Sequence, residues 1–226
     1  MIQINNLEYA YGASDFCLRV DDLSIRQGEK VAIIGPSGSG KTTLLKLIAG
    51  AISVPQGTIR VGQTRVDQLS DGQRRKFRVA NIGFVFQDFE LLEYLSVAEN
   101  ILLPYLINSA LKLNKQTRES VQALARNTGL HDKLARRPDQ LSQGERQRVA
   151  VCRALIAGPS VLLADEPTGS LDPSTASGVL ELLLEQATRN HATLLLVTHD
   201  HSLLAKFDRT IDMMQLQVTA MDRKAT

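Results

Sequence analysis

The 226-residue sequence has no tryptophan, only two cysteines, and no apolar run approaching the roughly 18 residues needed to span a bilayer. Cys17 and Cys152 lie too far apart for a Cys-x-x-Cys motif, and two cysteines do not make a disulfide framework. We interpret them as small core residues in a reducing compartment. The first residues, Met1 to Asn6, lack the basic and apolar regions of a signal peptide. These absences predict a soluble cytoplasmic protein; any action of it at a membrane would go through a partner.

Neither sign of charge dominates the composition. The chain has 26 Lys and Arg against 24 Asp and Glu, a formal net charge of +2. Proteins that bind nucleic acid usually concentrate basic charge on one face, and the basic run Arg74-Arg75-Lys76 is most simply a solvated surface. We therefore expect no nucleic-acid partner. With 43% hydrophobic residues, the chain is long enough for a real core in one large or two small domains.

One stretch fits the phosphate-binding loop pattern G-x-x-x-x-G-K-[ST] at every fixed position: Gly35-Pro36-Ser37-Gly38-Ser39-Gly40-Lys41-Thr42. The apolar run 30–35 before it predicts a buried strand, and residues 43–49 after it have helical spacing, with Gly50 as the stop. Free N–H groups and the helix dipole make such a junction an anion site. A turn without a ligand is the alternative, but the complete pattern in this context favours a nucleotide.

The phosphate loop assigns expected roles to its last residues. Lys41 would reach the β- and γ-phosphates, and the Thr42 hydroxyl would ligate Mg²⁺. Thr43, which opens the following helix, is included among the predicted nucleotide contacts.

The remaining strands are predicted from two patterns. Residues 1–27 alternate between apolar and polar positions, which indicates half-exposed antiparallel strands; the apolar positions are Ile2, Ile4, Phe16, Leu18, Val20, Leu23 and Ile25. Residues 58–62 and 81–86 are further strand candidates. The apolar runs 160–164 and 193–197 predict buried parallel strands, and residues 208–218 are expected to supply closing strands.

Helices are predicted between these strands. A capping box at Ser96 and Glu99 precedes an apolar run, a second helix is expected over 115–128, and Gly129 is its stop. Asp172 is expected to cap a helix that begins with Pro173. Residues 88–157 are therefore predicted to be a largely helical insert in one sheet.

Four polar side chains follow predicted strands, at the edge of the sheet where the phosphate loop also lies: Gln87, Asp165, Glu166 and His199. Ligands bind at the carboxyl ends of parallel strands. Asp165 suits a Mg²⁺-holding carboxylate, and Glu166 is placed to orient or deprotonate an attacking water. His199 could contact the γ-phosphate, although a lone histidine at a strand end is more often structural. The Gln87 amide could touch both Mg²⁺ and water.

A second informative stretch is Leu141-Ser142-Gln143-Gly144-Glu145. Locally, Ser142 and Glu145 form a capping box that opens a helix over 146–157. A serine and a glycine at a helix N-terminus also present a hydroxyl, N–H groups and a dipole to an anion. Because the first loop already has its own nucleotide, this second site would serve the γ-phosphate bound by another subunit.

In these motifs and in their order, the chain resembles the ATP-binding subunits of ABC transporters over nearly its full length. The resemblance implies an α/β fold of the P-loop NTPase type, one domain over 1–226. Its RecA-like, mostly parallel sheet and antiparallel β subdomain would comprise 1–87 and 158–226, and its helical subdomain 88–157. It also implies ATP hydrolysis, with ATP and Mg²⁺ as cofactors.

The resemblance further implies a head-to-tail homodimer that sandwiches two ATP molecules. Ser142 and Gly144 would act across the interface, and Asp172 would signal between the sites. Tyr11 matches the aromatic residue that stacks on adenine; Tyr9 is a nearby alternative, and either could instead be a strand aromatic.

Within the family, the segments around Gln87, Ser96 and Asp165 look like the LolD/MacB type. Such ATPases pair with permeases of the MacB/FtsX kind and drive export or extraction of lipoproteins, lipids, peptides or drugs. The alternative is an FtsE-like regulatory ATPase that moves a membrane partner in cell division without transport. Two positions depart from the common signature. Gln143 stands where the family commonly has glycine and adds bulk near the γ-phosphate site. Glu145 stands where the family often has glutamine, and either residue can close the capping box.

Overall fold

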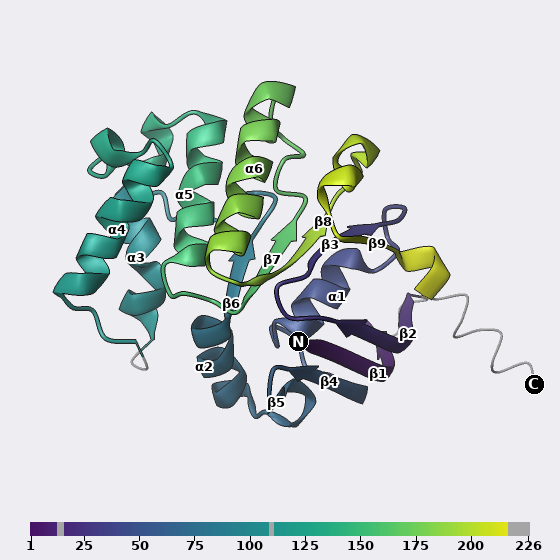
Figure 1. The fold of residues 1–226 in the computed structure, drawn as a ribbon. Helices are drawn as coiled ribbons and strands as arrows, with labels where there is room; N and C mark the ends of the chain where they lie inside the picture. Colours follow the sequence, from purple (N-terminus) through teal and green to yellow (C-terminus); the bar gives the residue numbers. More distant parts are fainter. Residues whose placement is uncertain (13–15, 109–110, 217–226) are drawn as a thin grey trace, which may run out of the picture.

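The computed structural model describes residues 1–12, 16–108 and 111–216, which form two β-sheets and the helices around them (Figure 1). The strands are β1 Ile2–Ala10, β2 Cys17–Ile25, β3 Lys30–Ile34, β4 Gln56–Val61, β5 Thr64–Arg65, β6 Ile82–Val85, β7 Val161–Asp165, β8 Thr193–Val197 and β9 Arg209–Asp212. The α-helices are α1 Lys41–Ile48, α2 Asp71–Asn81, α3 Val97–Ile107, α4 Lys115–Asn127, α5 Gln143–Leu155 and α6 Pro173–Arg189.

The central sheet is parallel, in the order β6-β7-β8-β3-β9. The apolar runs of β7 and β8 are buried almost throughout, as expected for strands covered on both faces. A second, antiparallel sheet has the order β2-β1-β4-β5, and its strands alternate buried and exposed residues. The predicted fold class, a P-loop α/β fold with an added antiparallel sheet, is confirmed.

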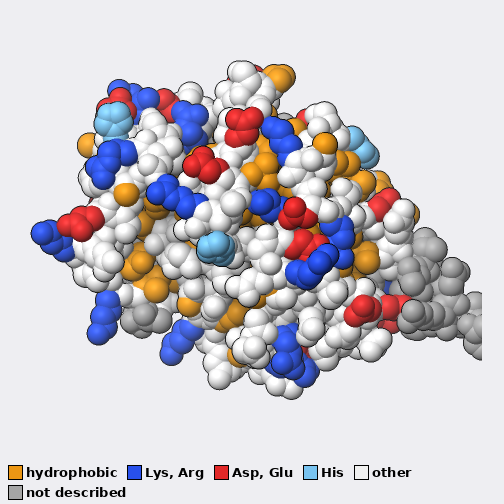
Figure 2. Space-filling view, viewed as in Figure 1, with side chains coloured by type: hydrophobic (Ala, Val, Ile, Leu, Met, Phe, Trp, Pro, Cys, Tyr) orange, Lys and Arg blue, Asp and Glu red, His pale blue; other side chains and the backbone are white. Residues whose placement is uncertain are grey.

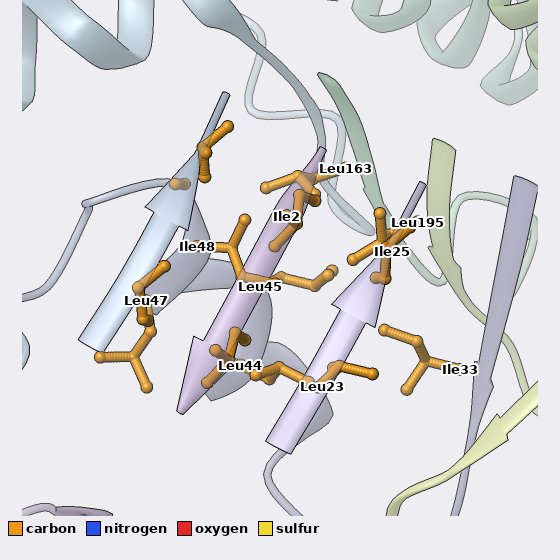
Figure 3. Packing of buried hydrophobic residues seen from close by; sticks show 14 of the residues in the cluster. Ile2, Leu23, Ile25, Ile33, Leu44, Leu45, Leu47, Ile48, Leu163 and Leu195 are labelled. Atoms are coloured by element: carbon orange, nitrogen blue, oxygen red, sulfur yellow. The ribbon is translucent and has the colours of Figure 1, made fainter. Parts of the chain in front are cut away.

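Helix α1 joins the two sheets into one core. Leu44, Leu45, Leu47 and Ile48 of α1 are buried against Ile2 and Ile25 of the antiparallel sheet and Leu163 and Leu195 of the parallel sheet (Figure 3). The helix ends at Ile48 and is followed by a left-handed turn at Gly50, where the Ala51 N–H donates to the Lys46 carbonyl and the Gly50 N–H to the Leu47 carbonyl. This paired arrangement satisfies carbonyls that the helix end would leave free.

Helices α3, α4 and α5 share a separate apolar cluster, which includes Val97, Ile101, Val121, Val149 and Cys152. The predicted capping box at Ser96 and the predicted helix near 115–128 are confirmed. That residues 88–157 constitute a subdomain of their own stays a prediction. Among the described residues, no helix is long and apolar enough to cross a membrane. On the face in Figure 2, cationic and anionic side chains are interspersed.

The structure differs from the sequence prediction in several elements, including the short strand β5, which was not predicted. Helix α2, absent from the prediction, begins at a Ser70–Gln73 capping box and buries only Phe77. Helix α5 begins at Gln143 rather than at residue 146, because Ser142 is itself the cap. The expected closing strands reduce to β9: residues 213–216 are helical, with Met213 buried in the core, and Val218 lies outside the described residues.

Helix α5 lies unusually close to the parallel sheet at Gly83. A Cβ added there would sit 2.4 Å from the Ala154 carbonyl oxygen, so only glycine fits without backbone movement.

We predict that Gly83→Ala lowers the free energy of unfolding by about 1–3 kcal/mol, because the added methyl group must displace backbone. Gly178→Ala is the matched control: a Cβ in this interior position of α6 meets nothing within 4 Å, and alanine should stabilise the helix by about 0.4–1 kcal/mol. Urea unfolding at unchanged m-value measures both. Equal midpoints for the two variants would contradict the close approach.

Candidate active site

The phosphate loop lies between the end of β3 and the start of α1. Gly40 precedes α1 with φ 92°, and a Cβ there would lie 3.0 Å from the Phe16 ring, so glycine is required by backbone and by space. Within the described part of the chain, no side-chain hydrogen bond caps α1 at Gly40. Because the first N–H groups of a helix have no partner within it, the start of α1 is free to bind an anion.

Lys41 is the charged group of this loop, and its side chain is held by the loop itself. Its ammonium donates to the carbonyls of Gly35 at 2.8 Å and Pro36 at 2.9 Å. Burial lowers the pKa of Lys41, while the nearby carboxylates of Glu166 and Asp165 act in the opposite direction. The lysine is thus a largely desolvated cation, 6% exposed, and such a charge attracts phosphate more strongly than one in water.

The ends of β7 and β8 bring Glu166 and His199 into contact. Asp165 is the last residue of β7 and pairs in register with Val197, so Glu166 and His199 emerge from neighbouring strands. Glu166 Oε1 lies 2.6 Å from His199 Nε2. Glu166 adopts a left-handed φ of 46° and its N–H donates to the Val197 carbonyl at 3.1 Å. Strain of this kind at a non-glycine residue is typical of functional sites.

A cavity of about 350 Å³ connects this pair with the phosphate loop. It is lined by Tyr11, Phe16, Ser37, Gly38, Gly40, Lys41, Thr42, Thr43, Glu166 and His199. A second cavity of about 620 Å³ lies on the other side of Glu166 and His199, against the start of α6. The carboxylate–imidazole pair therefore stands between two hollows, with the phosphate loop in only one of them.

Tyr11 and Tyr9, the two alternatives for stacking on adenine, lie in different surroundings. Tyr11 lines the cavity, and its hydroxyl lies 3.3 Å from the Thr43 hydroxyl. Tyr9 packs edge-on against Tyr11, with ring centroids 4.9 Å apart, and contacts the core. Phe16, predicted as a strand residue, instead precedes β2 and contributes a second aromatic wall. The sequence carried no signal for this role of Phe16, because its alternating pattern assigned the residue to a strand.

Gln87 follows β6, and the loop after it is held in an unusual conformation. Phe89 and Glu90 both have left-handed φ angles, 60° and 50°. Arg153 of α5 donates to both of their carbonyl oxygens, at 2.6 Å for Phe89. Burial lowers the pKa of Arg153. This clamp, which joins the loop beyond Gln87 to α5, was not predicted because its partners lie 63 and 64 residues apart.

The remaining predicted residues do not line the phosphate-loop cavity. Ser142 and Gly144 lie at the N-terminus of α5, where Ser142 and Glu145 form the predicted capping box. Asp172 is the N-cap of α6 and accepts hydrogen bonds from the N–H groups of Ser174 and Thr175. The two helix starts touch: a Cβ at Gly144 would lie 2.4 Å from the Thr175 methyl group. Gly144 is thus needed in its own chain, whatever it does across an interface.

Comparisons with known proteins agree with this geometry. Residues 18–169 match the ABC transporter family. The lipoprotein-releasing system ATP-binding protein LolD of Legionella pneumophila is 42% identical over 190 residues, 84% of this chain and 83% of that protein. LolD of Bacteroides thetaiotaomicron is 38% identical over 213 residues, 94% of this chain and 96% of that protein. A solved dimer of the ATP-binding cassette MJ0796 with ADP and Pi superposes with a TM-score of 0.84 at 32% identity, covering 94% of each chain.

The fold and the phosphate loop define a P-loop nucleotide-binding protein. The chain belongs to the ABC transporter family, as an ATP-binding subunit, and the resemblance to the LolD type is confirmed by these relatives.

We predict that Tyr11→Ala weakens ATP binding about 5- to 150-fold, since stacking of a base on an aromatic ring is worth about 1–3 kcal/mol. Tyr9→Ala should change binding much less, because Tyr9 faces the core. Titration with a fluorescent ATP analogue measures both affinities. A larger loss in Tyr9→Ala than in Tyr11→Ala would assign the stacking role to Tyr9.

We also predict that Arg153→Met releases the loop beyond Gln87. Amide hydrogen exchange over residues 87–91 should accelerate and ATP turnover should fall, while ATP affinity stays near that of the wild type. Arg126→Met, an exposed cation on α4, is the control. Unchanged exchange in this loop would show that the Arg153 contacts do not restrain it.

Proposed function

We propose that the chain is the ATP-hydrolysing subunit of an ABC transporter of the lipoprotein-releasing type, which acts as a head-to-tail homodimer on a membrane permease. The observation that carries the hydrolytic part is the Glu166–His199 contact of 2.6 Å at the edge of the phosphate-loop cavity. A carboxylate in this position is a general base with its orienting partner already in place.

Each residue of the cavity has a chemical task in this proposal. Lys41 and the first N–H groups of α1 bind the β- and γ-phosphates. Glu166 accepts a proton from, or orients, the water that attacks the γ-phosphorus in line. His199 fixes the Glu166 carboxylate and contacts the γ-phosphate. Because the transition state spreads negative charge over the phosphoryl oxygens, most of the catalysis is positioning and electrostatics.

The donor set at the sheet edge suits Mg²⁺. Thr42, Gln87 and Asp165 offer hydroxyl, amide and carboxylate oxygens, which are the ligands that this ion prefers. Asp165 lies close enough to Lys41 to influence the lysine's titration, so a carboxylate is present beside the phosphate loop. When bound, the ion would neutralise charge on the β- and γ-phosphates. Asp165 would hold its position through the register of β7 with β8.

The dimer is inferred from the position of Ser142 and Gly144 relative to the phosphate-loop cavity. Ser142 and Gly144 lie at the start of α5 and do not line the phosphate-loop cavity of their own chain; Ser142 is exposed and Gly144 is buried. A second copy in head-to-tail orientation would place the start of α5 on the γ-phosphate of its partner. The MJ0796 cassette is dimeric in its structure with ADP and Pi, which supports a dimer of this chain.

The permease partner would bind in an apolar groove near Gln87. A groove of about 250 Å³ is lined by Phe84, Phe86, Leu103, Pro104 and Ile107, and by the clamp residues Glu90 and Arg153. Ile107 is 68% exposed and Leu106 50% exposed at its rim. A short amphipathic segment of a MacB/FtsX-like permease would fit these apolar walls. Through Phe86 and the Arg153 clamp, its movement would reach Gln87 and the cavity.

Lipoprotein is the cargo class that the relatives favour, because the LolD proteins are named as parts of a lipoprotein-releasing system. In this proposal the chain has no contact with the cargo. It sits on the inner face of the cell membrane through its permease and supplies mechanical work.

We predict that Glu166→Gln retains ATP binding, loses ATP turnover by about 10²–10⁴-fold as expected for removal of a general base, and accumulates as an ATP-bound dimer. Phosphate release and analytical ultracentrifugation measure the two effects. Glu185→Gln, an exposed position on α6, is the control. An undiminished turnover in Glu166→Gln would remove Glu166 from the role of base.

A further inference from the structure

The carboxylate of Glu145 is held by two groups at the start of α5. Its Oε2 accepts the Ser142 N–H at 2.9 Å, which closes the capping box. Its Oε1 lies 2.7 Å from the Lys133 ammonium. The two side chains are only 17% and 20% exposed, so this ion pair is partly withdrawn from water. The Lys133 partner, followed by the Ser142 backbone, lowers the pKa of Glu145, which keeps the carboxylate ionised.

This ionised carboxylate stands at an anion-binding helix terminus. Glutamine at the same position would close the capping box without charge. Glutamate adds a negative charge in the first turn of α5, where the free N–H groups and the helix dipole attract anions. Without a cationic partner, the Glu145 carboxylate would repel an incoming phosphate, and partial burial would strengthen this repulsion.

Hydrogen bonds hold the backbone around Lys133. It ends the 3-10 turn His131–Lys133, and its N–H donates to the Leu130 carbonyl. The following carbonyls of Leu134 and Arg136 accept the Ala98 and Val97 N–H groups at the start of α3. The segment that carries Lys133 therefore also accepts the first N–H groups of α3. Because its backbone is already held, forming the ion pair requires little further ordering of this segment.

We propose that Lys133 is a positioning residue for the interface ATP site: it neutralises Glu145, so that the start of α5 can accept the γ-phosphate of the nucleotide held by a second copy of the chain. The inference rests on the proposed head-to-tail dimer. Lys133 acts through Glu145 and touches no reacting atom. Its pairing explains how a chain with glutamate at this position of the signature keeps an anion site.

The test is a double-mutant cycle in the Glu166→Gln background, with dimer formation measured by analytical ultracentrifugation as ATP is titrated with Mg²⁺ present. Lys133→Met should raise the ATP concentration at half-dimerisation by about tenfold. Glu145→Gln should stay within about twofold of the parent. The double variant Lys133→Met with Glu145→Gln should return to within about twofold of the parental value, because, as in the parent, no unpaired charge is left. Lys133→Arg should retain the parental midpoint.

Lys115→Met is the matched control, since Lys115 pairs with Glu119 at 3.9 Å on the exposed side of α4. Monomer ATP affinity and the thermal midpoint of each variant separate a local effect from unfolding. Parental dimerisation of Lys133→Met overturns the inference, as does a double variant no better than Lys133→Met. A Glu166→Gln parent that binds ATP and never dimerises overturns the proposed dimer itself, a distinct failure visible before any Lys133 variant is made.

Discussion

The parallel register of β3, β7 and β8 is the constraint on which the site depends. Parallel strands end at one edge, so the phosphate loop after β3, the carboxylates after β7 and the imidazole after β8 must all meet there. The strands are bound to that register by burial on both faces, because a shifted strand would break ladder hydrogen bonds with no water to replace them. The Glu166–His199 contact is a consequence of this packing, and the left-handed conformation of Glu166 is its local cost.

Helix α5 connects β6, the start of α6 and the loop after Gln87. It lies against β6 at Gly83 and against the start of α6 at Gly144, two approaches with no room for a side chain. From its other end, Arg153 holds the loop that follows Gln87. A shift of α5 as a rigid body would therefore move its first residues and the loop after Gln87 together, because close packing and two hydrogen bonds connect them.

The sequence predicted those features that depend on residues close together along the chain. The phosphate loop, the strand-end residues and the capping boxes at Ser96 and Ser142 are local patterns, and the structure places them as expected. It did not predict α2, because a helix that buries only Phe77 has almost no apolar periodicity. Nor could it pair Lys133 with Glu145 or Arg153 with Phe89, since each contact depends on how separate elements pack. Phe16 was expected in a strand because it continues the alternation of Leu18 and Val20, but β2 begins one residue later.

The central claim is that each chain holds half of two ATP sites, and mixed dimers test it most directly. A Lys41→Ala chain cannot hold ATP but offers an intact Ser142, whereas a Ser142→Phe chain holds ATP but cannot close its partner's site. Each variant alone should remain monomeric with ATP. Their mixture should yield a heterodimer that carries a single ATP, observed by native mass spectrometry. A mixture that contains only monomers, with ATP bound to the Ser142→Phe chain, would contradict the account.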